Sequence, residues 1–230
     1  MISLSIGIKK GIARIHDPDA EAKNMEYVSA RAEVLRRDKW TCQGCGFVSK
    51  GNLKKEPNTL EFSGFLEVHH LDNNHGNNSA GNLATVCPFC HEIFHAGIAG
   101  RLDRCIPIVL PEFSHAVLNR WCHVLFSVIE RAQNSSDVVY AKRLYKELED
   151  RNQLLPVSLQ SQESLGNALA ALSMDEYKQR ERYLAGIRLL PRRDAFSRYV
   201  QYYNETSWAD IGKDWSKYKS AIVSALKKGN

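Results

Sequence analysis

Cys42-Gln-Gly-Cys45, Glu67-Val-His69-His70 and Cys87-Pro-Phe-Cys90-His91-Glu-Ile-Phe-His95 are the three segments that decide the fold of this chain. Together they place four thiols and four imidazoles within 54 residues. Two Cys-x-x-Cys pairs are typical of tetrahedral metal sites, because each pair presents two thiolates from one tight turn. We therefore predict a structural zinc ion, whose ligands are Cys42, Cys45, Cys87 and Cys90.

Two other interpretations of the second cysteine pair have to be weighed. Cys87-Pro-Phe-Cys90-His91 also matches the sequence for covalent c-type haem attachment, and Cys-Pro-Phe-Cys resembles a redox dithiol. Haem attachment requires export, whereas residues 1–17 lack the charged flank and apolar block of a signal peptide. Neither interpretation explains the upstream pair at Cys42 and Cys45. Metal-bound thiolates in a cytoplasmic protein are therefore the preferred prediction.

The histidines predict a second metal site. His91 and His95 are four residues apart on a predicted helix, so their side chains share one face. His69, at the end of a predicted strand, can complete three ligands and leave positions open for water and phosphate. Strand alternation points His70 away from them, which makes it the candidate for an unliganded imidazole that takes a proton from water.

The order of these residues resembles the HNH, or ββα-metal, nucleases. A His pair follows a strand, Asn82 begins an Asn-Leu-x-x-x-Cys sequence, and two histidines lie on the next helix. The resemblance implies His70 as general base, His69, His91 and His95 as ligands of a catalytic divalent ion, and Asn82 as the residue that fixes the loop carrying the base. The ion would polarise a phosphodiester. Imidazole ligands favour zinc, nickel or manganese over magnesium for it.

A second resemblance covers more of the chain. The segments that carry it, besides the strand-like start and the Cys-x-x-Cys pairs, are Leu110-Pro111-Glu112, Leu118-Asn119, Cys122-His123-Val124-Leu125-Phe126, Leu189-Leu190-Pro191 and Phe196. They resemble the IcmJ/DotN proteins of Dot/Icm type IVB secretion and related conjugation systems. The resemblance implies a zinc-bound HNH-like fold that serves the coupling complex, which brings substrates to an ATPase at the inner membrane. Members of that family can lack the His pair, which this sequence retains.

The pattern of apolar residues predicts an α+β fold in two parts. Residues 1–100 are expected to form the zinc-bound HNH-like domain and residues 101–230 a mainly α-helical lobe, with a linker at 152–163. Alternation or β-branched content predicts strands at 2–8, 62–71, 83–86 and 106–110. Helical spacing and capping signals predict helices at 27–38, 88–96, 117–128, 136–148, 173–190, 194–203 and 214–228.

Charge bears on the choice between two functions, an adaptor and a DNA endonuclease or nickase. Residues 1–100 hold 11 Lys and Arg against 11 Asp and Glu, whereas residues 101–230 hold 20 against 15. A protein that binds a polyanion normally clusters cations near its site. In the first 100 residues only a few cations qualify for that task, namely Lys50, Lys54, Lys55, Arg31, Arg36 and Arg37.

The adaptor is therefore the first hypothesis. Its expected partners are a coupling-protein ATPase or other secretion-system subunits, with DNA as the partner in the alternative. No run approaches 18 consecutive apolar residues, so we expect no direct insertion into a membrane. A cytoplasmic protein, peripheral at the inner membrane through its partner complex, is the expected location.

Overall fold

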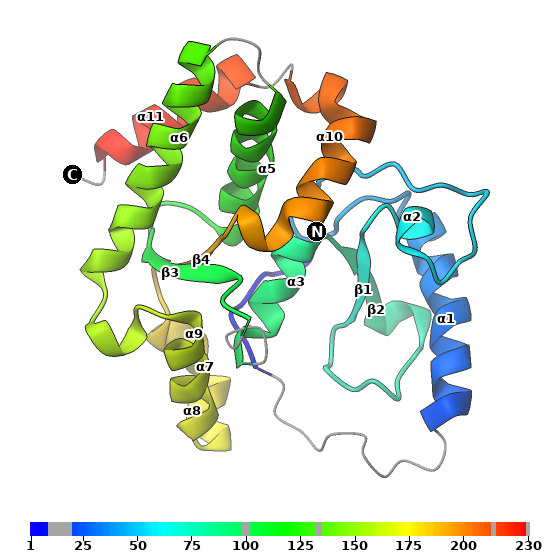
Figure 1. Ribbon diagram of the computed structural model, residues 1–230. Coiled ribbons are helices and arrows are strands. Elements are labelled where there is room, and N and C mark those ends of the chain that lie inside the picture. Colours follow the sequence, from blue (N-terminus) through cyan, green and yellow to red (C-terminus); the bar gives the residue numbers. More distant parts are fainter. Residues whose placement is uncertain (9–19, 98–101, 132–134, 213–214, 229–230) are drawn as a thin grey trace.

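The computed structural model describes residues 1–8, 20–97, 102–131, 135–212 and 215–228. Within these ranges the fold is α+β, with many helices and two small antiparallel sheets. The first half contains α1 (Ala20–Arg37), α2 (Leu60–Ser63), β1 (Glu67–His70), β2 (Leu83–Val86) and α3 (Pro88–Phe94). Figure 1 shows α1 beside the β1–β2 hairpin, with α3 nearer the centre of the molecule.

The second half is mainly helical, as predicted. Its elements are β3 (Cys105–Val109), α5 (His115–Arg131), α6 (Ser135–Asp150), α7 (Gln162–Ala171), α8 (Met174–Lys178), α9 (Arg180–Tyr183), β4 (Ile187–Pro191), α10 (Ser197–Gly212) and α11 (Trp215–Lys228). Short 3-10 turns are η1 (Ala80–Asn82), η2 (Arg151–Leu154), η3 (Val157–Leu159) and η4 (Asp194–Phe196). In the described residues, no helix is long and apolar enough to cross a membrane.

The β1–β2 hairpin and α3 bring the predicted site residues together. His69 pairs with Ala84 and His70 with Leu83 across the hairpin, and every residue of β2 is buried. Cys87 is the N-cap of α3, and Pro88 occupies the first turn, where its missing N–H costs no helical hydrogen bond. The predicted strand at 83–86 and the helix that begins at the second cysteine pair are therefore confirmed.

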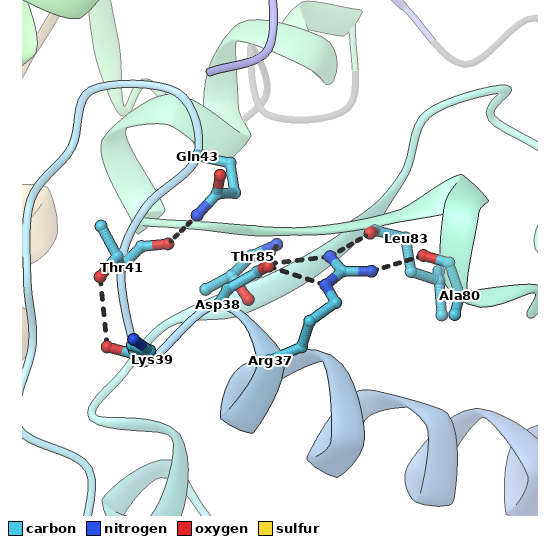
Figure 2. Close-up of polar contacts among 8 residues, drawn as sticks. All are labelled: Arg37, Asp38, Lys39, Thr41, Gln43, Ala80, Leu83 and Thr85. Carbon is cyan, nitrogen blue, oxygen red and sulfur yellow. Dashed lines mark hydrogen bonds and ion pairs between the residues drawn. The ribbon is translucent and has the colours of Figure 1, made fainter.

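The end of α1 is tied to this hairpin by Arg37 and Asp38 (Figure 2). Arg37 donates to the carbonyl oxygens of Ala80 at 2.6 Å and Leu83 at 2.8 Å. The Asp38 carboxylate accepts from Arg37 and from the backbone N–H of Thr85 at 3.0 Å. These bonds fix β2 against α1, in which Ala32, Val34 and Leu35 are buried and Val28 is exposed.

Three predicted elements differ from the structure. Residues 2–8 form no strand, because the Gly7 backbone bonds to the end of α3 (Gly7 N–H to Ile93 O, 2.9 Å) instead of to a neighbouring strand. The predicted strand at 62–71 is helical at first, since the Thr59 side chain caps α2 and Gly64, with φ +61°, ends it. Only β1 remains extended.

The third difference is the predicted helix at 173–190. Its capping box at Ser173 and Glu176 is present, but the helices end at Tyr183. Gly186 then adopts φ +82°, and residues 187–191 pair with β3 as β4. A short apolar run such as Ile187–Pro191 fits either a helix or a strand, and here the partner strand decides.

One hydrophobic core extends through both halves of the molecule. At its centre the His123 ring stacks on Phe47 with ring centroids 3.9 Å apart and an interplanar angle of 9°. Phe89 and Tyr199 pack against the same imidazole. The segments around Phe47 and Phe89 in the first half and helices α5 and α10 in the second thus share one core. The domain boundary near residue 100 and the linker at 152–163 stay predictions.

Candidate metal centres

The four predicted cysteines form one buried cluster. Their sulfur atoms all lie within 4.8 Å of one another, and each residue is at most 1% exposed. Cys42 and Cys45 lie in a tight turn, in which the Cys42 N–H donates to Phe47 O at 2.8 Å and the Gly46 N–H to Cys42 O at 2.8 Å. Gly46 has φ +76°, a conformation that favours glycine. The first turn of α3 supplies Cys87 and Cys90.

The geometry of this cluster fits a tetrahedral metal ion. The sulfurs of Cys45 and Cys87 are 3.7 Å apart, and both are free thiols. A disulfide would bring them to ~2.05 Å, whereas four sulfurs each ~2.3 Å from a central zinc are separated by roughly 3.8 Å. N–H donors also point at the sulfurs, from Cys45 N to Cys42 Sγ at 3.4 Å. The four cysteines can therefore hold a metal ion in a closed site.

The helical half completes the surroundings of the cysteine cluster. The Asn119 side chain on α5 donates to Cys90 Sγ at 3.2 Å, and Arg120 donates through Nε to Cys45 O at 2.6 Å. Such donors orient thiolate ligands and stabilise their charge. Sequence reasoning missed both residues, because no local pattern connects α5 to cysteines 29 and more positions earlier.

The three predicted histidine ligands also come together. One ring nitrogen each of His69, His91 and His95 lies within 4.8 Å of the others. The His91 and His95 ring centroids are 4.5 Å apart, and the His69 ring stacks on Phe94 at 4.1 Å. These side chains line a cavity of about 390 Å³. An ion there would have three nitrogen ligands and open positions.

Glu67 is a member of this site that sequence reasoning missed. Its carboxylate lies 2.8 Å from His91 Nδ1, which leaves His91 Nε2 for the metal. Burial disfavours the charged imidazole, but Glu67 outweighs it and raises the pKa of His91. Burial, followed by the charges of His91 and His95, lowers the pKa of His69 to about 3. His69 is thus neutral near pH 7, as a metal ligand must be.

His70 is not one of the three converging histidines, but it lines the same cavity. Its Nε2 is 3.0 Å from Asn78 Oδ1, and its ring stacks on Tyr27 at 5.3 Å. An amide oxygen only accepts, so this contact requires a proton on Nε2 and leaves the lone pair on Nδ1. Asn78 in turn donates to Glu26 Oε2 at 3.3 Å. Sequence reasoning missed the contribution of Asn78.

Asn82 lies beneath the loop that joins the two strands. Its side chain donates to Asp72 Oδ1 at 2.8 Å and Asn77 O at 2.9 Å, and it accepts from the Asp72 N–H at 3.1 Å. Both ends of the loop are therefore held by one amide. His75, which lies in this loop, has its ring centroid 4.9 Å from that of His70.

Comparison with known proteins gives a relative for the whole arrangement. No family model matches the chain. The type 4 apparatus protein DotN of Legionella pneumophila is 27% identical over 195 residues, which are 80% of this chain and 82% of DotN. The chain is a DotN-like protein. Because 195 residues exceed either half of this DotN-like chain, the similarity includes parts of both the metal-site half and the helical half. The HNH architecture stays a prediction.

The arginines of α1 in the DotN-like chain are engaged in holding the fold. Arg31 donates to Pro57 O at 2.8 Å and Leu66 O at 3.3 Å, and Arg37 binds the two carbonyls already described. The Arg36 guanidinium lies 5.4 Å from the centre of the Phe62 ring. Arg36 and Arg37 are exposed all the same, whereas Arg31 is half-buried.

Proposed function

We propose that this DotN-like protein is an accessory component of a type IVB secretion or conjugation apparatus. In this role it docks on the coupling ATPase or another subunit, at the cytoplasmic side of the inner membrane. The observation that carries the proposal is the similarity to a type 4 apparatus protein across both halves of the chain. A match confined to the cysteine pairs would have supported only a shared metal site.

The architecture supports a docking role. Zinc bound by the four cysteines would stabilise the turn at residues 42–45 and the start of α3, because the unfolded chain cannot present these four ligands together. Asn119 and Arg120 on α5 join that turn to the helical half. The zinc ion would thus stabilise the packing of α5 against the first half of the molecule, on which the fold of the docking protein depends.

Co-purification tests the docking role. The tagged full-length protein is expressed in its own host at native level and purified without a crosslinker. It is expected to retain the coupling ATPase through the washes. His91→Ala is expected to retain it equally, whereas Cys87→Ser is expected to lose it with the fold. Recovery of the wild-type protein without any secretion-system subunit would contradict the proposal.

A second candidate function, metal-dependent DNA endonuclease or nickase, has its own supporting observation. Three histidine nitrogens converge on one point, and His70, with a free Nδ1, lines the same cavity. A divalent ion, when bound, would polarise a phosphodiester and stabilise the leaving oxygen. His70 would accept a proton from the attacking water through Nδ1, while Asn78 holds the Nε2 proton and Asn82 fixes the loop.

A plasmid assay tests the second candidate. The protein with manganese, nickel or magnesium is expected to convert supercoiled plasmid to the nicked form. His70→Ala is expected to abolish nicking and to retain the zinc, while His75→Ala, which removes the neighbouring imidazole, retains most of the activity. Nicking that survives His70→Ala would exclude His70 as the base.

A further inference from the structure

A cleft between the two halves of the molecule adjoins the histidine site. It has a volume of about 440 Å³ and is lined on one side by α1, α2 and β1 and on the other by η4 and the first turn of α10. Tyr27, Glu67, Val68 and Arg104 line both this cleft and the histidine cavity. The two hollows are therefore adjacent, and these four side chains lie between the histidines and the start of α10.

Three arginines line this cleft, two from the helical half and one from the first half. Arg198 is exposed on α10, and among the described residues it has no hydrogen bond or ion pair. Arg104 extends from the start of β3 and its side chain is 39% exposed. Arg31 adds a third guanidinium, which donates to two backbone carbonyls and also interacts electrostatically with Glu67.

The carboxylates at the cleft are already paired. Glu67 lies 2.8 Å from His91 Nδ1, and Glu92, in the histidine cavity, lies 2.7 Å from Arg104 Nη1. The positive charge of Arg198, which has no carboxylate partner among the described residues, is therefore in excess. An anionic ligand gains from this excess, and a divalent ion at the histidines would add to it.

Aromatic and apolar side chains accompany these cations. Phe65, Tyr27 and Leu60 line the cleft, and Leu60 is 45% exposed. Alternating guanidinium groups and aromatic rings bind single-stranded nucleic acid, because phosphates pair with the cations while unstacked bases lie on the rings. A cavity of this size accommodates a nucleotide that has left a base stack, whereas a duplex presents its bases stacked and paired.

From these observations we infer that the cleft between β1 and the start of α10 is a binding subsite for single-stranded nucleic acid, with Arg198 on a phosphate and Phe65 under a base. The inference deepens the endonuclease candidate and rests on it for the nature of the ligand. It assigns a specific task to the helical half, which lies outside the nuclease-like motif. It also removes the objection that the metal-site half is electrically neutral, since the cations come from across the cleft.

The test measures binding and cleavage separately. Full-length His70→Ala protein, which cannot use His70 as a base, is titrated into a fluorescein-labelled oligothymidine of about 20 nucleotides, and fluorescence anisotropy is recorded at several salt concentrations. Adding Arg198→Glu is expected to weaken binding roughly tenfold. It is also expected to reduce the slope of the logarithm of the binding constant against the logarithm of the salt concentration by about one. Phe65→Leu is expected to weaken it several-fold with the salt dependence unchanged.

Arg182→Glu is the matched control, because it makes the same charge change on exposed α9, away from the cleft. It is expected to alter binding less than twofold. Equal weakening by Arg182→Glu and Arg198→Glu would overturn the subsite, as would wild-type affinity in Arg198→Glu or no binding at all.

Failure of the two ideas can be told apart. Arg198-dependent binding without plasmid nicking by the wild type would retain the subsite and reject the endonuclease. Nicking that is unaffected by Arg198→Glu would reject the subsite alone.

Discussion

The cysteine cluster and the histidine cluster each take two residues from α3 or its caps, but they have very different surroundings. The cysteines are sealed, at most 1% exposed, and residues of the helical half donate hydrogen bonds to the cluster. The histidines line a cavity of about 390 Å³, and the His91 side chain is 24% exposed. A closed four-sulfur site suits an ion that holds a fold, and an open three-nitrogen site suits an ion that meets a ligand. The following experiments test that contrast.

Loss of a cysteine ligand is expected to have the largest effect. Cys87→Ser should release zinc and unfold the protein, because the binding free energy of a structural zinc, about 10–16 kcal/mol in small zinc peptides, is also folding free energy. Through α5 the helical half should lose its near-UV circular dichroism as well. Metal analysis and circular dichroism measure the two effects. A folded, metal-free Cys87→Ser protein would show that the cluster is not structural.

Acid should destabilise the core next to the cysteine cluster. Burial, the first cause, lowers the pKa of His123 to about 4, and its Nδ1 donates to Asn119 O at 2.7 Å. The unfolded chain takes up this proton near pH 6.5, so the stability is complete above pH 6.5 and falls as pH decreases toward 4. Titration of this one group is expected to lower the free energy of unfolding by about 2 kcal/mol between pH 7 and pH 5.

Urea unfolding at pH 7 and pH 5 measures this loss. His123→Gln cannot titrate, so its stability should depend less on pH than that of the wild type. The zinc site is common to both proteins, so it contributes equally to the pH dependence of the unfolding free energy in each. If the two proteins lost equal stability between pH 7 and pH 5, His123 would not be the titrating group.

Asn119→Ala should have a moderate effect confined to the metal. Removing the N–H donor to Cys90 Sγ is expected to weaken zinc retention about 10- to 100-fold, the usual range for a residue that orients a ligand. Competition with a coloured chelator measures the zinc affinity. Asn167→Ala, on the exposed face of α7, is the control. Unchanged affinity in Asn119→Ala would mean that α5 covers the cluster without stabilising it.

Loss of a histidine ligand should have the smallest effect on stability. His91→Ala is expected to change the free energy of unfolding by less than about 1 kcal/mol, because the cavity around it is already open. Calorimetric titration with manganese or nickel should show the second ion lost while zinc content is retained. Unfolding comparable to that of Cys87→Ser would erase the distinction between the two sites.

Both clusters could be predicted from the sequence because their chemistry is local. Cys-x-x-Cys turns and the i, i+4 spacing of His91 and His95 place ligands side by side whatever the rest of the chain does. The strand at 83–86 and the capping box at Ser173 were predictable for the same reason. These features are determined within a few residues.

The missed features depend on contacts between distant segments. Asn119 and Arg120 meet the cysteine cluster only because α5 packs across α3, and Asn78 meets His70 only after the loop has folded back. Residues 187–191 become a strand because β3 is there to pair with them. No local pattern encodes such partners, so the periodicity of those segments alone gives a different structure.

The aromatic stack under the cysteine turn sets an order in which the molecule can be completed during synthesis. Phe47, His123 and Tyr199 come from three widely separated parts of the chain, and the Tyr199 hydroxyl lies 2.9 Å from His123 Nε2. The ribosome makes Phe47 early and Tyr199 in the last part of the chain. The four cysteines, which could hold a metal ion, are therefore all made long before α10 arrives to cover the stack. Until then, the apolar surface beneath the metal site faces water.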